Sequence, residues 1–120
     1  GADLATPDDG KPLGYEPLRI VASQTARIEA DIDRLVENLQ PLKSFILPGG
    51  SPAAAALHLA RTVARRAERL MVALGQVEGE HVNPEGIRYI NRVSDLLFAA
   101  ARAANDGGKA DVLWVPGQNR

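Results

Sequence analysis

Apolar residues recur at helical spacing in three stretches of the chain. The first stripe has four members at intervals of four, three and four residues: Ile28, Ile32, Leu35 and Leu39. Such spacing places side chains on one face of an α-helix. Ser23 suits the N-cap of this helix, and Pro41 and Pro48 punctuate its end.

Two further helices are predicted from Pro-containing start signals. Ser51 and Asn83 each precede a proline, which predicts an N-cap followed by proline at the first helical position. We expect the second helix over about 52–74 and the third over about 84–104, ended by the stretch NDGG at 105–108.

The two ends of the chain lack this periodicity. Residues 1–22 hold three prolines and three glycines, which indicates an irregular surface segment. The final stretch, DVLWVPGQNR at 111–120, is too short for a helix and is predicted to lie extended on the helices.

Three amphipathic helices with short connections predict an all-α fold, an antiparallel helical bundle formed as one domain over residues 1–120. Their side chains are mostly Ala, Leu and Val, and only 4% of the residues are aromatic. Three such helices bury little apolar area. We therefore expect partner helices, from a further segment or from other subunits.

Composition narrows the function classes. The chain has 14 basic and 15 acidic residues, a net charge of −1, which does not favour nucleic-acid binding. It has no cysteine, which excludes zinc–thiolate sites and thiol nucleophiles and is compatible with a reducing compartment. No run approaches the roughly 18 apolar residues of a membrane span, and no export signal is recognisable. We expect a cytoplasmic protein without membrane contact.

The second predicted helix carries an unusual density of arginine. Its predicted apolar face comprises Leu57, Ala60, Val63, Ala64, Ala67, Leu70 and Met71. Four cationic or titratable residues share the opposite flank: His58, Arg61, Arg65 and Arg69. Glu68 lies at the seam, and Arg66 points toward solvent. One interpretation is a solvated face with helical ion pairs. The other is a site for a polyphosphate, because arginine binds phosphate oxygens bidentately.

The third helix offers a second polar set. Asn91 and Asp95 are one turn apart, with Arg88 and Arg102 on the same flank. Its predicted buried face comprises Ile87, Ile90, Leu97, Phe98 and Ala101. Asn91 is either a boundary residue bonded to a neighbouring helix or a donor to a nucleotide. We expect Asp95 to pair with an arginine.

Phe45 and the two histidines complete the candidates. Phe45, before the PGG turn, is either a core plug, the commoner case, or a ligand contact. His58 is more typical of a packed or surface residue than of a ligand. His81 has no partner at metal-ligand spacing, so no protein metal site is predicted. The sequence contains no Walker loop, no GxGxxG motif and no GxSxG elbow.

Three motifs together resemble a known family. SFILPGGS, ALHLARTVARRAER and YINRVSDLLF, with GADLATP at the start and DVLWVPG near the end, are similar to the PduO-type ATP:cob(I)alamin adenosyltransferases. The resemblance implies a five-helix bundle that forms a homotrimer with active sites between subunits. It implies transfer of the 5′-deoxyadenosyl group of ATP to cob(I)alamin, giving adenosylcobalamin and triphosphate.

The resemblance also implies residue roles. The ATP-site residues, assisted by Mg²⁺, would be Arg65, Arg66, Glu68, Arg69 and Asn91. Arg65 and Arg61 would serve catalysis, Arg61 through a salt bridge at the subunit interface. Phe45 would displace the lower ligand of cobalamin. A reductase and an adenosylcobalamin-dependent acceptor enzyme are possible further partners.

One departure from the family pattern stands at the start of the chain. The family's stretch of the type TxxGDxGxT, which wraps the ATP phosphates, and the two helices after it have no counterpart here. We expect the chain to hold half of the ATP site and to be inactive alone.

Two alternatives to an adenosyltransferase remain. One is a non-enzymatic helical module that binds an anionic ligand, RNA or a protein through the Arg61–Arg69 face, and the other is a purely structural bundle.

Overall fold

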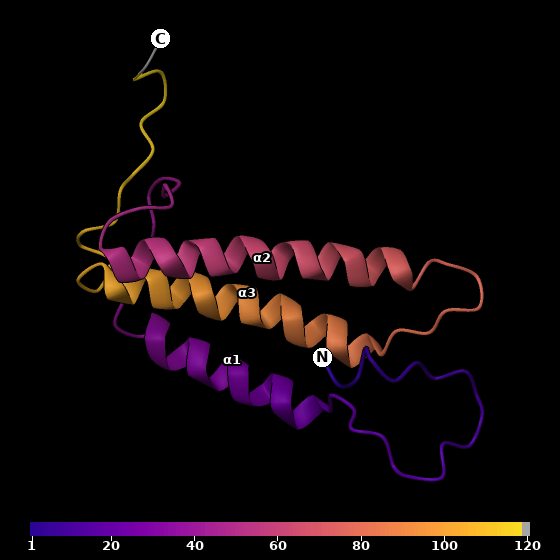
Figure 1. Ribbon diagram of the computed structural model, residues 1–120. Coiled ribbons are helices and arrows are strands. Elements are labelled where there is room, and N and C mark those ends of the chain that lie inside the picture. Colours follow the sequence, from indigo (N-terminus) through magenta and orange to yellow (C-terminus); the bar gives the residue numbers. More distant parts are fainter. Residues whose placement is uncertain (119–120) are drawn as a thin grey trace.

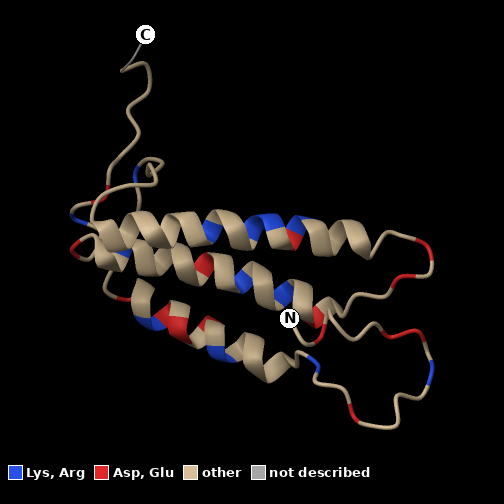
Figure 2. Cartoon of the chain, in the orientation of Figure 1, with Lys and Arg blue, Asp and Glu red and all other residues tan. Residues whose placement is uncertain are grey.

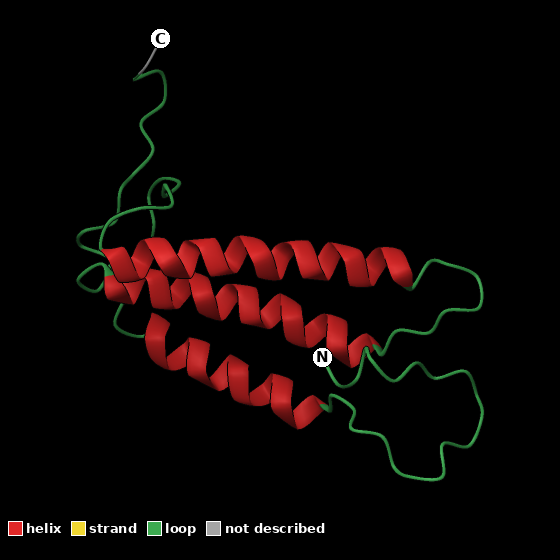
Figure 3. Ribbon diagram, viewed as in Figure 1, coloured by secondary structure: helices red, strands yellow, loops and turns green. Residues whose placement is uncertain are grey.

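The computed structural model describes residues 1–118 as three α-helices with irregular connections (Figures 1 and 3). They are α1 (Ala22–Val36), α2 (Pro52–Leu74) and α3 (Pro84–Ala104). Within these residues every regular element is a helix, so the predicted all-α class is confirmed. The bounds of α2 and α3 also match those expected from their start and stop signals.

The starts of α2 and α3 have the predicted caps. The Ser51 hydroxyl accepts a hydrogen bond from the Ala54 amide at 3.1 Å. The Asn83 side-chain carbonyl accepts one from the Glu85 amide at 3.0 Å. Each cap satisfies an amide that has no partner inside the helix, and the following proline has no such amide.

The first helix begins and ends earlier than expected. Its N-cap is Val21, not Ser23, and the Val21 amide donates to the Gln24 side-chain carbonyl at 3.0 Å. Gln24 thus supplies the reciprocal half of a capping box. Because α1 ends at Val36, Leu39 lies outside the helix. Of the predicted apolar stripe, Ile28 alone is fully buried.

The middle position belongs to α3, which has α1 on one side and α2 on the other (Figure 1). Successive helices run in opposite directions, as predicted, so α1 and α3 are parallel neighbours. Within the described residues the backbones of α1 and α2 do not approach each other closely. The described part is therefore a single layer of helices, 56 × 34 × 22 Å in extent, with small residues such as Ala54, Ala64 and Ala99 in its core.

The orientation of α2 differs from the predicted one. Leu57, Ala64, Ala67 and Met71 of the predicted apolar face are buried or half-buried, whereas Ala60, Val63 and Leu70 are exposed. His58 is buried and Arg61 half-buried, so both lie on the side that packs on α3 and not on an opposite polar flank. The apolar surface of α2 is wide enough for two partners, and α3 covers only one part of it. All five residues of the predicted buried face of α3 are at least half-buried.

A buried polar cluster closes one end of the layer. Arg102 is 8% exposed, and its Nε donates to Asp111 at 2.8 Å while its Nη2 donates to the Gln40 carbonyl at 2.8 Å. Asn105 bonds the Ser51 amide at 2.8 Å and the Gly49 carbonyl at 3.0 Å. Arg88 and Arg102, which were predicted to share a flank, therefore differ in environment: Arg88 is exposed and Arg102 is buried.

The C-terminal segment does not lie along the helices. Ile46 and Leu113 form an antiparallel bridge, so the segment pairs with the connection that precedes α2. Both segments project from the end of the layer (Figure 1). An extended segment needs hydrogen-bond partners for its backbone. Residues 44–47 offer free N–H and C=O groups, whereas the backbone groups of a helix are already bonded within the helix. The last two residues of the predicted extended stretch, 119 and 120, lie outside the described residues.

Candidate functional site

Three of the predicted site residues form one hydrogen-bonded network between α2 and α3. Arg65 Nη1 donates to Glu68 at 2.5 Å, an ion pair between residues about one helical turn apart. The second carboxylate oxygen of Glu68 accepts from Asn91 Nδ2 at 2.8 Å. The boundary role considered for Asn91 is thus present, because its amide crosses to the neighbouring helix. Glu68 thereby fixes the positions of Arg65 and Asn91 together.

Arg92 extends this network to α1. Its Nη1 donates to the side-chain carbonyl of Asn91 and to Asp95, both at 3.0 Å, and its Nε donates to Glu29 at 2.9 Å. The expected arginine partner of Asp95 is therefore Arg92. Sequence reasoning missed Arg92, whose only signal was its place directly after Asn91.

A hollow of about 230 Å³ opens beside the network, between all three helices. Its lining is largely polar or charged: Thr25, Glu29, Glu68, Ile87, Arg88, Asn91 and Arg92. Thr25 donates a 2.6 Å hydrogen bond to Glu85 at its edge, and this bond lowers the pKa of the Glu85 carboxyl. Ligand pockets usually enclose about 300–1,000 Å³, so this hollow is too small to enclose a whole ligand of ordinary size.

The remaining arginines of α2 supply uncompensated positive charge (Figure 2). Arg66 and Arg69 are exposed, and neither forms an ion pair with a carboxylate within residues 1–118. Arg61 lies 5.0 Å above the ring centroid of Phe98, a cation–π contact that holds its guanidinium against α3. The charge excess favours an anionic ligand over a fully compensated surface.

His58 is a packed residue. It is 4% exposed, its ring meets Phe98 edge-on at 6.3 Å, and its Nε2 has no hydrogen-bond partner within the described residues. Burial lowers the pKa of His58 and Arg61 lowers it further, while Asp111 opposes them. A neutral imidazole is therefore favoured at this position.

Phe45 is not a core plug, so the commoner interpretation was wrong. Its side chain is 77% exposed, and its ring meets Trp114 edge-on with centroids 6.1 Å apart. Phe45 precedes the start of α2, whereas Arg65 lies 13 residues after Pro52, about 20 Å along the helix. The structure therefore keeps Phe45 apart from the Arg65–Asn91 network of one chain.

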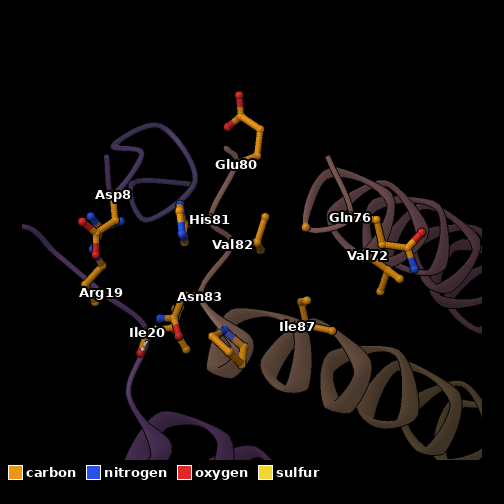
Figure 4. Close-up of a pocket in the computed structure, with 12 residues that line it drawn as sticks. Asp8, Arg19, Ile20, Val72, Gln76, Glu80, His81, Val82, Asn83 and Ile87 are labelled. Atoms are coloured by element: carbon orange, nitrogen blue, oxygen red, sulfur yellow. Dashed lines mark hydrogen bonds between the residues drawn. The ribbon is translucent and has the colours of Figure 1, made fainter. Parts of the chain in front are cut away.

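A larger hollow, of about 790 Å³, lies where residues 8–20 approach the connection between α2 and α3 (Figure 4). Two of its polar side chains, Arg19 and Asn83, already have hydrogen-bond partners within the chain. Arg19 bonds Asp3 at 2.9 Å and the Thr6 carbonyl at 2.6 Å, and Asn83 bonds Asp3 at 2.8 Å. Burial raises the pKa of Asp3, but these bonds and one from the Ile20 amide outweigh it and lower the pKa. The cluster fastens the N-terminal segment to α3.

Neither a metal-binding cluster nor a membrane-spanning helix is found within the described residues. Residues 1–118 contain no group of three or more His, Asp or Glu side chains placed to bind a metal ion. In the same part of the chain no helix is both long and apolar enough to cross a bilayer.

The helical layer and its arginine-rich α2 describe an all-α protein with a positively charged helix face. Comparison with known proteins gives its family. The family model described as cobalamin adenosyltransferase matches residues 1–104. The chain belongs to the cobalamin adenosyltransferase family. This confirms the resemblance seen in the motifs.

Curated relatives agree with this assignment. The chain is 50% identical over 120 residues to a corrinoid adenosyltransferase of Mycobacterium tuberculosis, covering 100% of this chain and 61% of the relative. It is 52% identical over 103 residues to the corrinoid adenosyltransferase PduO of Citrobacter freundii, covering 85% of this chain and 29% of the relative. The chain thus spans about three fifths of the length of its mycobacterial relatives.

A solved structure shows the same fold. A variant PduO-type ATP:corrinoid adenosyltransferase from Lactobacillus reuteri, complexed with cobalamin and ATP, superposes with a TM-score of 0.82 at 39% identity. The match covers 95% of this chain and 60% of that one.

Proposed function

We propose that the protein transfers the 5′-deoxyadenosyl group of ATP to cob(I)alamin, giving adenosylcobalamin and triphosphate. The carrying observation is the Arg65–Glu68–Asn91 network with the uncompensated Arg66 and Arg69 on the same helix. Family membership over residues 1–104 supports the reaction. The relatives named above are adenosyltransferases, and the Lactobacillus reuteri protein binds both substrates.

The proposed chemistry needs no protein nucleophile. The cobalt(I) ion supplies an electron pair to C5′ of the ribose, a Co–C bond forms, and the C5′–O bond to triphosphate breaks. The leaving triphosphate gains negative charge, which fixed guanidinium groups stabilise. Arg65, Arg66 and Arg69 would provide this charge, and Arg61 would support the site from the α2–α3 packing. Mg²⁺ enters this proposal only as the counterion that ATP carries on its phosphate oxygens.

Glu68 and Asn91 would act differently from the arginines. A carboxylate repels phosphate, so Glu68 would orient Arg65 rather than bind triphosphate. The Asn91 amide is a neutral donor and acceptor, which suits the sugar or base of ATP. The two side chains bond each other, and this contact keeps both in place.

Phe45 is proposed to contact the corrin ring of cobalamin. Phe45 and Trp114 are both exposed and touch each other, and contiguous exposed apolar surface of this kind marks a ligand or protein contact. Contact with the lower face would displace the lower ligand of the cobalt and exclude water from it.

The separation of Phe45 from the arginines supports a site shared between subunits, and we propose a homotrimer. The exposed stripe of α2, formed by Leu59 (67% exposed), Val63 (48%) and Leu70 (65%), would lie within the assembly. We further propose a reductase and an acceptor of adenosylcobalamin as partners, and a location in the bacterial cytoplasm.

The test is adenosylation by the full-length protein with ATP and reduced cobalamin, followed in the corrin absorbance spectrum. Arg65→Ala should lower kcat/KM for ATP about 10- to 100-fold, the range for a charged hydrogen bond. Arg34→Ala is the matched control, because the Arg34 side chain is 75% exposed on α1. No conversion under strong reduction, or equal effects of the two substitutions, would contradict the proposal.

A further inference from the structure

The segment that carries Phe45 is held almost entirely by the C-terminal segment. Trp114 donates its amide to the Phe45 carbonyl at 2.8 Å, and Leu47 donates to the Val112 carbonyl at 2.7 Å. The Ser44 hydroxyl donates to the Trp114 carbonyl at 2.7 Å. These bonds flank the Ile46–Leu113 bridge. Phe45 and Trp114 are therefore directly opposite, and side chains of opposed residues share one face of a β-bridge.

The C-terminal segment is in turn fixed to the helices just before Trp114. Asp111 accepts from Arg102 at 2.8 Å and from Asn105 at 3.3 Å, and all three are buried or half-buried. Asn105 also binds the Gly49 carbonyl, four residues after Phe45. The rigid end of α3 thus holds Asp111, Asp111 begins the segment that carries Trp114, and Trp114 contacts Phe45.

We infer that Trp114 is the positioning residue for Phe45: its indole fixes the Phe45 ring in the orientation that meets the corrin. This inference rests on the proposed function of Phe45. An exposed phenylalanine on a loop otherwise samples several rotamers, and ordering it on binding costs affinity. The edge-to-face contact at 6.1 Å and 65° selects one arrangement before cobalamin arrives.

Positioning can be tested without cobalamin by fluorine NMR of the full-length protein with 4-fluorophenylalanine at position 45. Trp114→Ala should move the resonance at least halfway to that of the free amino acid, because the indole ring current is lost. Trp114→Tyr should keep most of the displacement. A second label at Phe98, which lies in α3, is the reference and should not move. An unchanged Phe45 resonance in Trp114→Ala would overturn the inference.

Kinetics of the full-length protein test the consequence for the reaction. Trp114→Ala should lower kcat/KM for cob(I)alamin about 2- to 12-fold, the range for an aromatic pair, with the KM for ATP unchanged. Trp114→Tyr should restore most of the loss. Tyr15→Ala removes an aromatic ring that is 64% exposed elsewhere and should change neither constant.

A double-mutant cycle decides whether Trp114 acts through Phe45. Combined with Phe45→Ala, Trp114→Ala should cause no further loss, whereas multiplied effects would overturn the inference. If Phe45→Ala itself leaves kcat/KM for cob(I)alamin unchanged, the proposed role of Phe45 is wrong. The fluorine spectrum then still decides separately whether Trp114 positions the ring.

Discussion

At the scale of single residues, His58 shows how packing changes the chemistry of a side chain. It is surrounded by the Phe98 ring of α3, by Arg61 one turn along α2 and by Asp111 of the C-terminal segment. Burial and the Arg61 charge lower its pKa in the folded state relative to the ordinary value of 6.5. Between those two values the unfolded chain binds more protons than the folded chain, so folding stability rises with pH there.

We therefore predict that acid weakens the fold through His58. Its contribution should be complete above about pH 6.5 and should fall as the pH drops through that value toward the lower folded pKa. The slope from one proton is at most about 1.4 kcal/mol per pH unit. Urea unfolding between about pH 7.5 and pH 5.5 measures it. His58→Leu should flatten this dependence. Equal slopes in the wild type and His58→Leu would contradict the prediction.

At the scale of elements, the start of α2 depends on one glycine. Gly50 has φ of +102°, and a Cβ at this position would come within 2.2 Å of the Asn105 side chain. Asn105 cannot retreat without breaking its bonds to the Ser51 amide and the Gly49 carbonyl. Gly50→Ala should therefore lower the free energy of unfolding by about 2–5 kcal/mol, from backbone strain and lost hydrogen bonds.

Gly14→Ala is the matched control for Gly50→Ala in the same denaturant titration. Gly14 also has a positive φ, +72°, but nothing lies within 4 Å of its added Cβ. It should show only the backbone strain, about 1–2 kcal/mol. If the two substitutions cost the same, the Asn105 cluster does not hold the start of α2.

The elements were predictable where their signals are local, and their mutual arrangement was not. Ser51 and Asn83 act within three residues of their own positions, so the starts of α2 and α3 could be predicted. The orientation of α2 could not, because its apolar residues cover more of its circumference than α3 buries. Likewise α1 packs on α3 rather than on α2, a choice that the 15 residues between α1 and α2 leave open.

The candidate site was likewise predictable from the sequence only in part. Arg65, Glu68 and Asn91 could be predicted from helical spacing and from motifs. Arg92 and Trp114 could not, because their partners are distant in sequence: Arg92 reaches Glu29 on α1, and Trp114 reaches Ser44, 70 residues away. Phe45 was misjudged because a lone phenylalanine usually packs in a core, whereas this one stands on a bridge outside the helices.

At the scale of the whole molecule, the single layer of helices leaves the outer face of α2 without a partner in the described residues. Leu59, Val63 and Leu70 recur at helical spacing on this face and are 48–67% exposed. Burying one such side chain contributes about 1.5–3 kcal/mol. A partner that covered all three would therefore be bound with a substantial free energy. Figure 1 shows α1 and α3 on the same side of α2.

We predict that this face is an assembly surface of the full-length protein. Leu70→Glu should weaken self-association at least about 10- to 100-fold, the equivalent of one lost leucine contact. Sedimentation of the variant should show dissociation at concentrations where the wild type stays assembled. Leu18→Glu is the matched control, because Leu18 is 78% exposed but lies in the N-terminal segment. Dissociation of the variant would identify another copy as the partner. A lower melting temperature without dissociation would instead show that this face packs within one chain, and would contradict the prediction.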